Sequence, residues 1–212
     1  FHSKGLSVPE IYAEDLAKDI YLQEDLGDVT LFDYLLKTRS GRKDFPPELL
    51  KTYEQIVELL PQFQIIGGQG LDYGKSYPHH SFDRQSMMWD LNYFKYYFLK
   101  LAHIRFNEQK LEEDFQTFTD FLLQADGNHF LYRDFQSRNI MLKDGKPWFI
   151  DYQGGRKGAL QYDVASLLFD AKADLPFDVR EHLLDHYLSA VDKLLPIDRV
   201  LFTKHYYAFV FI

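Results

Sequence analysis

The sequence predicts an α+β protein in which two antiparallel strands lead into a mainly helical body that contains one β-hairpin. Three observations support this fold class. Apolar and polar residues alternate over residues 6–25, as they do in half-exposed strands. The apolar spacing then becomes helical over most of the chain. Within the helical part, residues 139–151 form two apolar arms joined at Asp144 and Gly145, a favoured tight-turn pair.

The first half of the chain is expected to continue from the strands into two helices. Asp28 can cap a helix over residues 29–39, because short polar side chains accept hydrogen bonds from the first amides of a helix. Pro47 suits the start of the next helix, residues 48–60, because proline lacks an N–H that the first turn would leave unused. The glycine-rich residues 67–80 are expected to form an ordinary loop, since no Gly-Lys-Ser/Thr ends them.

The second half is predicted to be helical on both sides of the hairpin. Residues 86–106 indicate a long aromatic-rich helix, and Asn107 can cap the next one, which Gly127 can end. After the hairpin, helical spacing covers residues 162–171, 179–195 and 199–212.

Composition excludes several classes of protein. The chain has 212 residues, is 46% hydrophobic and carries a formal net charge of −8. It is too apolar to be disordered and too acidic to be a general binder of nucleic acid. No apolar run approaches the ~20 residues that span a bilayer. The absence of cysteine excludes disulfides and fits a cytoplasmic protein. We therefore expect neither nucleic acid nor a membrane as a partner; the oligomeric state does not follow from the sequence.

Three polar residues surround the hairpin. Asn139 precedes its first arm and Asp151 follows its second, so the hairpin must bring them together. An amide oxygen beside a carboxylate suits a hard cation such as Mg²⁺. Asp134 lies on the loop just before, where it can orient a hydroxyl and accept its proton. Metal, base and in-line positioning are the parts that phosphoryl transfer needs.

The segments around these residues resemble a known family. "YRDFQSRNIML" and "WFIDYQ" resemble the catalytic and metal-binding loops of the protein-kinase-like fold, and most of all those of the aminoglycoside phosphotransferase family. With "YLQEDLGDVTL" and "IDYQGGRKGALQYDVASLL", the sequence looks closest to kinases of cell-wall amino sugars, which act on N-acetylmuramate or N-acetylglucosamine. The similarity runs over most of residues 8–170.

The resemblance implies a role for individual residues. Asp134 would be the catalytic base, and Asn139 and Asp151 would hold Mg²⁺ against the phosphates of ATP, or of GTP as an alternative. The backbone of Gln23, Glu24 and Asp25 would form a hinge that contacts the purine. Asp163 matches a position that supports the catalytic loop from the start of a helix. A plain helix cap is the other interpretation, and the two roles can coexist.

The sequence departs from the family pattern in two places. Tyr132 stands where the family usually has histidine, at a position that mainly supports the geometry of the loop. The glycine-rich turn and phosphate-pairing lysine of the family would lie before Phe1. We therefore expect residues 1–26 to be the remaining part of an N-terminal β lobe with its hinge, and residues 27–212 to be a helical C-terminal lobe, both cut from a longer protein.

Candidate substrate contacts come from the long helix and the catalytic loop. Resemblance places Trp89 and Asp90 beside the acceptor site. The aromatic run "NYFKYYF" that follows could simply pack in the core, but it could also form a platform for a sugar ring. Arg138 could meet a phosphate or a substrate carboxylate, and Arg133 could pair with a nearby acid in support of the site.

The sequence therefore predicts an ATP- and Mg²⁺-dependent small-molecule kinase, with an amino sugar as the first choice of acceptor. An aminoglycoside or choline-type kinase is the alternative within the family. A pseudokinase-like binding module is the alternative from another class, although the presence of Asp134, Asn139 and Asp151 argues against it. His182 and His186 stand four residues apart on a predicted helix, but a zinc site of the protease type would need a third ligand and a motif glutamate that is absent, so no metal is expected there.

Overall fold

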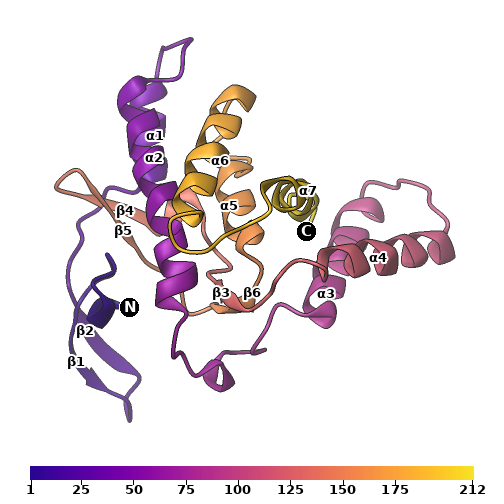
Figure 1. The fold of residues 1–212 in the computed structure, drawn as a ribbon, viewed down its shortest axis with the longest axis horizontal. Coiled ribbons are helices and arrows are strands. Elements are labelled where there is room, and N and C mark those ends of the chain that lie inside the picture. The colour runs from indigo at the N-terminus through magenta and orange to yellow at the C-terminus, as the bar shows by residue number, and fades with distance from the viewer.

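The computed structural model describes residues 1–212 as seven α-helices and six short strands (Figure 1). The helices are α1 (Leu31–Arg39), α2 (Pro47–Pro61), α3 (Arg84–Phe94), α4 (Glu108–Leu122), α5 (Leu160–Leu168), α6 (Phe177–Val191) and α7 (Arg199–Phe209). The strands are β1 (Ile11–Asp15), β2 (Ile20–Gln23), β3 (His129–Leu131), β4 (Ile140–Lys143), β5 (Lys146–Phe149) and β6 (Arg156–Gly158). None of the helices combines the length and the apolar character needed to cross a bilayer.

The strands form three separate two-stranded antiparallel sheets. The pairs β1–β2 and β4–β5 are the two hairpins that the sequence predicts. The pairing of β3 with β6 was not predicted, because each strand has three residues and the two lie far apart in the chain. Figure 1 shows β1–β2 projecting at one side of the molecule and α3 with α4 at the other.

The cap of α1 differs from the predicted one. Thr30, rather than Asp28, is the N-cap residue: its hydroxyl accepts a hydrogen bond from the Asp33 amide at 3.0 Å. The Asp33 carboxylate in turn accepts one from the Thr30 amide at 3.2 Å. This reciprocal capping box satisfies two amides that a lone Asp28 would leave open. Pro47 begins α2 as predicted.

The aromatic segment after α3 lies largely at the surface. The predicted helix over residues 86–106 is shorter: α3 gives way to a wider π-helical turn at Lys95–Leu99. Tyr93 and Tyr97 stack at a ring distance of 4.3 Å, yet they are 64% and 63% exposed. The aromatic run therefore forms an open face rather than core. Helix α4 begins after Asn107 as predicted, but it ends at Leu122, before Gly127.

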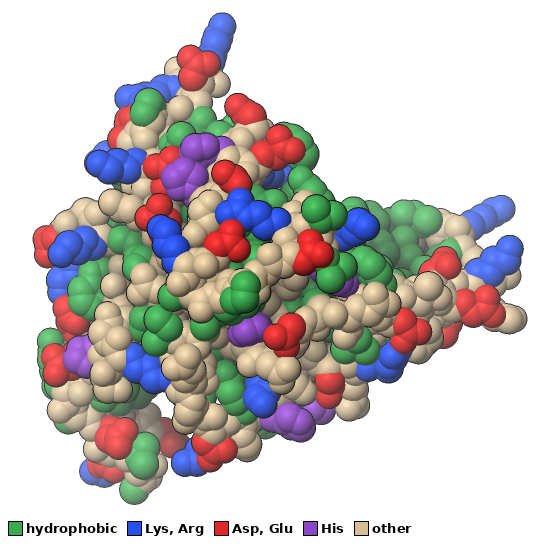
Figure 2. Space-filling model, in the orientation of Figure 1, with side chains coloured by type: hydrophobic (Ala, Val, Ile, Leu, Met, Phe, Trp, Pro, Cys, Tyr) green, Lys and Arg blue, Asp and Glu red, His purple; other side chains and the backbone are tan.

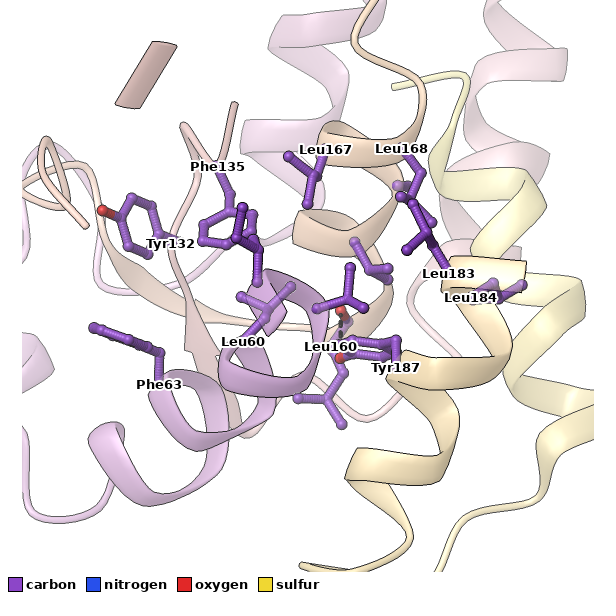
Figure 3. Close-up of a cluster of buried hydrophobic side chains, with 14 of the residues drawn as sticks. Leu60, Phe63, Tyr132, Phe135, Leu160, Leu167, Leu168, Leu183, Leu184 and Tyr187 are labelled. Carbon is purple, nitrogen blue, oxygen red and sulfur yellow. Dashed lines mark hydrogen bonds between the residues drawn. The ribbon is translucent and has the colours of Figure 1, made fainter. Parts of the chain in front are cut away.

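The core lies between α2, α5 and α6 and continues into the loop after β3. A cluster of 36 buried residues fills it, and α2 packs along α6. Figure 3 shows Leu60, near the end of α2, and Phe63, in the turn that follows it, facing Tyr132 and Phe135. The rings of Tyr132 and Phe135 meet edge to face at 5.1 Å. The loop that carries Asp134 is therefore anchored on both sides of that residue by buried aromatic rings.

Replacement of the α1 cap tests the corrected assignment. We expect Thr30→Ala to lower the free energy of unfolding by about 1 kcal/mol, because it leaves the first amides of α1 without a side-chain acceptor. Asp28→Ala, at the position that sequence alone favours, should have no measurable effect. Urea unfolding of both variants measures the difference; equal losses for the two would contradict the assignment.

Candidate active site

The β4–β5 hairpin brings Asn139 and Asp151 together, as predicted. Ile140 pairs with Phe149 in the hairpin, and the Ile150 amide donates to the Asn139 carbonyl at 3.1 Å. Asp151 follows directly and has a positive φ of 65°. Two potential oxygen ligands thus lie at adjacent positions at the base of one rigid element.

The side chain of Asn139 is already oriented by the loop. Its amide nitrogen donates to the Asp134 carbonyl at 2.9 Å, and its amide oxygen accepts no hydrogen bond. The Asp151 carboxylate is exposed and accepts one hydrogen bond, from the Gln153 side chain. A free amide oxygen beside a free carboxylate oxygen is a donor set that fits a hard divalent cation. Gln153 was not predicted as part of this site.

Asp134 is exposed beside these two residues. The pKa of Asp134 is raised, first because neighbouring protein displaces water from the carboxylate and further because Asp151 is also negative; Arg133 opposes this shift. The position where a Cβ on Gly154 would lie is 3.3 Å from Asp134 Oδ2, so a glycine there keeps the approach to the carboxylate open. A carboxylate of raised pKa that is open to solvent suits a general base.

A short 3₁₀ turn supports the segment between Asp134 and Asn139. The Gln136 amide donates to the Asp134 carbonyl, and the Asn139 amide donates to the Gln136 carbonyl, both at 2.9 Å. Ser137 is buried, and its hydroxyl donates to Asp170 at 2.6 Å. Ser137 and Asp170 were not predicted to support the site, because their partnership joins positions 33 residues apart.

Asp163 is fully buried at the root of the catalytic loop. Its carboxylate accepts hydrogen bonds from the amides of Tyr132 (2.8 Å) and Arg133 (3.1 Å). It also accepts one from the Gln64 side chain at 3.0 Å. Burial raises the pKa of Asp163 to about 7. The three hydrogen bonds act in the opposite direction, because they stabilise the ionised form. Ala159 is the N-cap residue of α5, so the alternative that Asp163 caps the helix was wrong.

Gln64 and Tyr187 complete this network and were missed from the sequence. The Tyr187 hydroxyl donates to Gln64 Oε1 at 2.6 Å, and Gln64 also donates to the Leu160 carbonyl. Both side chains are buried. The only local signal was a glutamine between apolar residues in "QFQII", which does not identify a partner. Every polar group in this network has a hydrogen-bond partner. The network therefore rigidifies the site without the free-energy penalty of an unpaired buried polar group.

The side chains of Tyr132 and Arg133, whose amides bind Asp163, each make further contacts that fix the loop. The Tyr132 hydroxyl donates to the Ile150 carbonyl at 2.5 Å and so ties the catalytic loop to the segment that carries Asp151. Arg133 has a positive φ of 82° and pairs with Asp90 at 2.8 Å. Its guanidinium also donates to the Tyr162 hydroxyl. These contacts agree with a supporting role for both residues.

The predicted substrate contacts are divided between neighbouring hollows. A cavity of about 560 Å³ is lined by Asp90, Tyr93, Phe94, Tyr97, Phe98, Arg133, Tyr162 and Ile212. A second, of about 400 Å³, includes Asp134 and Arg138 and shares Arg133, Tyr162 and Ile212 with the first. Trp89 lines neither one; its ring packs against His79. Asp90 and Arg138 are thus brought near the candidate base, whereas Trp89 is not.

A third cavity lies on the other side of Asp151. It has a volume of about 610 Å³ between the β1–β2 hairpin and residues 150–153, and Gln23 is among its lining residues. Glu24 and Asp25 lie outside it. Lys143 donates to the Glu24 carboxylate at 2.7 Å and to the Asp25 carbonyl at 2.9 Å. This lysine links the β4–β5 hairpin to the predicted hinge, and the sequence did not identify it.

The sequence of this chain matches one family of known proteins. The sequence model of the phosphotransferase enzyme family matches residues 1–197. The chain is 29% identical over 169 residues to N-acetylmuramate/N-acetylglucosamine kinase of Neisseria meningitidis serogroup B, covering 78% of this chain and 47% of that protein. It is 27% identical over 176 residues to the protein of the same name from Pseudomonas aeruginosa, covering 81% and 47%. The chain spans about half the length of these curated relatives.

Solved structures agree on the architecture. Choline kinase from Cryptosporidium parvum superposes with a TM-score of 0.63 at 13% identity, covering 96% of this chain and 64% of that one. The ADP-bound aminoglycoside phosphotransferase APH(2'')-Ib superposes with a TM-score of 0.54 at 14% identity, covering 97% and 75%. The predicted α+β, protein-kinase-like fold and the resemblance to aminoglycoside phosphotransferases are confirmed.

The buried Asp163 provides a stability test of the site. We expect Asp163→Asn to lower the free energy of unfolding by about 2 kcal/mol or more, because the new amide group cannot accept from all three donors and leaves at least one buried N–H without a partner. Asp114→Asn, an exposed position on α4, is the matched control and should be neutral. Denaturant unfolding measures both, and a neutral Asp163→Asn would contradict the role assigned to this carboxylate.

Proposed function

We propose that this chain, which belongs to the phosphotransferase enzyme family, forms the catalytic part of an enzyme that transfers the terminal phosphoryl group of ATP to a hydroxyl of a small molecule. The observation that carries the proposal is the arrangement of Asp134, Asn139 and Asp151 on one loop and one hairpin, with the Asn139 amide oxygen and the two carboxylates open to ligands. In this proposal residues 1–26 supply the nucleotide-facing strands and hinge, and residues 27–212 supply the catalytic lobe.

Asn139 and Asp151 are the residues that would hold Mg²⁺, which supplies charge neutralisation on the nucleotide phosphates. Asp134 orients the acceptor hydroxyl and takes its proton as the acceptor oxygen bonds to phosphorus and the bond to the bridging oxygen of ADP breaks. The raised pKa of Asp134 makes this carboxylate a stronger base than a fully solvated one.

The cavity of about 610 Å³ beside β1 and β2 is where we place the nucleotide. Asp151 is one of its lining residues, so phosphates bound beside Asp151 would meet the metal ligands. Gln23, Glu24 and Asp25 would supply the purine contacts; Gln23 lines the cavity itself. The Glu24 amide already donates to the Glu10 carbonyl, which leaves its own carbonyl as the free group at this position. ATP is our first choice of nucleotide, with GTP as the alternative.

We propose an amino sugar such as N-acetylmuramate or N-acetylglucosamine as the acceptor. Two curated relatives carry these molecules in their names. The open tyrosine face of the cavity of about 560 Å³ suits the flat apolar side of a sugar ring. Asp90 lies there but is paired with Arg133, so it offers little net negative charge to a cation. This pairing favours a neutral or anionic sugar over an aminoglycoside or choline.

Loss of the base tests the enzymatic proposal. We expect Asp134→Ala in the complete protein to reduce the rate of phosphorylation at least ~100-fold, the lower range for loss of a positioned base. Asp114→Ala, an exposed aspartate on α4, is the control and should retain full activity. ADP release in a screen of amino sugars, aminoglycosides and amino alcohols is the measurement. Equal turnover by Asp134→Ala would reject the role of this residue as the base. Absence of ADP release with every acceptor would favour the pseudokinase-like alternative.

Arg138 tests the choice between two sugars. It lines the hollow that contains Asp134, and its side chain makes only one hydrogen bond, to Gln136 at 3.3 Å. If it meets the carboxylate of muramate, Arg138→Ala should raise the KM for N-acetylmuramate about 10-fold, the equivalent of one charged hydrogen bond. The KM for N-acetylglucosamine, which lacks that carboxylate, should change little. Parallel changes for the two sugars would reject this contact.

A further inference from the structure

Four ionisable side chains meet on the outer surface of the α2–α6 pair. Glu54 and Glu58 stand four residues apart on α2, and His182 and His186 stand four residues apart on α6. The i, i+4 spacing puts each pair on one face of its helix. Because α2 and α6 pack along each other, the two faces come together at their seam. Figure 2 shows histidine side chains among acidic ones on the surface of the molecule where these helices lie.

The ligand atoms of this cluster lie within coordination reach of one ion. The atoms of Glu54, His182 and His186 are all within 4.8 Å of one another. Glu54 Oε1 is 2.7 Å from His182 Nε2 and 3.7 Å from His186 Nε2. Ligand bonds of roughly 2.0–2.2 Å in a tetrahedral zinc site place neighbouring ligand atoms a little over 3 Å apart. The two observed distances lie on either side of that separation, and the two histidine nitrogens lie within 4.8 Å of each other, so side-chain rotation would bring the three ligand atoms into a tetrahedral arrangement.

No hydrogen bond accounts for the position of the second histidine. His182 and Glu54 form an ordinary hydrogen bond. His186 makes none: its Nε2 is too far from Glu54, and its Nδ1 is 3.5 Å from Glu58 Oε1. Its two nitrogens nevertheless face two different carboxylates. This is the arrangement in metal sites where one ring nitrogen binds the ion and the other donates to a carboxylate behind it.

We propose that Glu54, His182 and His186 bind a Zn²⁺ ion, with Glu58 orienting the His186 ring from behind. Two imidazoles and a carboxylate are typical zinc ligands, and the fourth position is left to water. The three side chains are 25–44% exposed, so the ion can reach them from solvent. The −8 net charge of the chain favours uptake of a cation.

The proposed ion would fasten α2 to α6 rather than take part in phosphoryl transfer. None of the four residues lines the cavities that contain Asp134 or Asp151. The core between these two helices also holds Gln64 and Tyr187, which support Asp163. The zinc site does not rest on the proposed function, and its test reads binding and stability, so either proposal can fail alone.

The test is a titration of metal-free protein, produced without a polyhistidine tag, with ZnCl₂ in a calorimeter. We expect one Zn²⁺ per chain and a rise in melting temperature on saturation, because an ion that binds only the folded state stabilises it. His186→Ala and Glu54→Gln should each weaken binding at least ~10-fold and abolish the rise. His80→Ala, an exposed histidine outside the cluster, is the matched control and should bind as the wild type does.

A second readout separates loss of ligand from loss of fold. Co²⁺ should give the visible absorption of a tetrahedral site in the wild type and in His80→Ala, and should lose it in His186→Ala, while circular dichroism shows the helices intact in all of them. Absence of stoichiometric Zn²⁺ binding by the wild type would overturn the proposal. So would equal affinities in the wild type, His186→Ala and Glu54→Gln.

Discussion

The buried carboxylate of Asp163 is the contact on which the candidate site depends. It holds two consecutive amides, those of Tyr132 and Arg133, directly before Asp134. A charged group at zero exposure costs free energy unless its oxygens are satisfied, and Gln64 supplies the remaining donor. The polar network therefore fixes where the catalytic loop leaves the core. It also explains why Arg133 can keep a backbone conformation with positive φ, which a less constrained loop would relax.

From this anchor the local geometry of the site follows in a few steps. Tyr132 donates across to the carbonyl of Ile150, which ties the segment before the base to the segment that carries Asp151. The β4–β5 pairing then places Asn139 opposite that segment. The amide nitrogen of Asn139 donates to the Asp134 carbonyl, which leaves the amide oxygen without a hydrogen bond from the protein. The arrangement is preorganised by backbone contacts, which is what precise binding of an ion requires.

Much of this could be predicted from the sequence, because it depends on short-range patterns. The β4–β5 hairpin has a strong turn signal, and the residues that frame it must be neighbours. The partners that hold the site could not be predicted in the same way. Gln64, Lys143 and Asp170 each act through a residue more than thirty positions away.

The Asp28 cap and the length of the aromatic helix were wrong for a local reason. Thr30 competes for the same turn with a better geometry, and a π-helical turn interrupts the helical spacing after Phe94. The approach of Glu54 to His182 and His186 depends on helix packing, which no single segment encodes.

The link from Lys143 to Glu24 and Asp25 has a mechanical consequence. Lys143 is the last residue of β4, and the base of the same hairpin carries Asn139 and Asp151. A paired strand resists bending within its plane, so a displacement of one end of the hairpin is transmitted to the other end. A tilt of the strands near Gln23 would therefore shift the β4–β5 hairpin and with it the side-chain oxygens of Asn139 and Asp151 beside Asp134. Lys143 therefore couples the position of the β1–β2 hairpin to the position of Asn139 and Asp151.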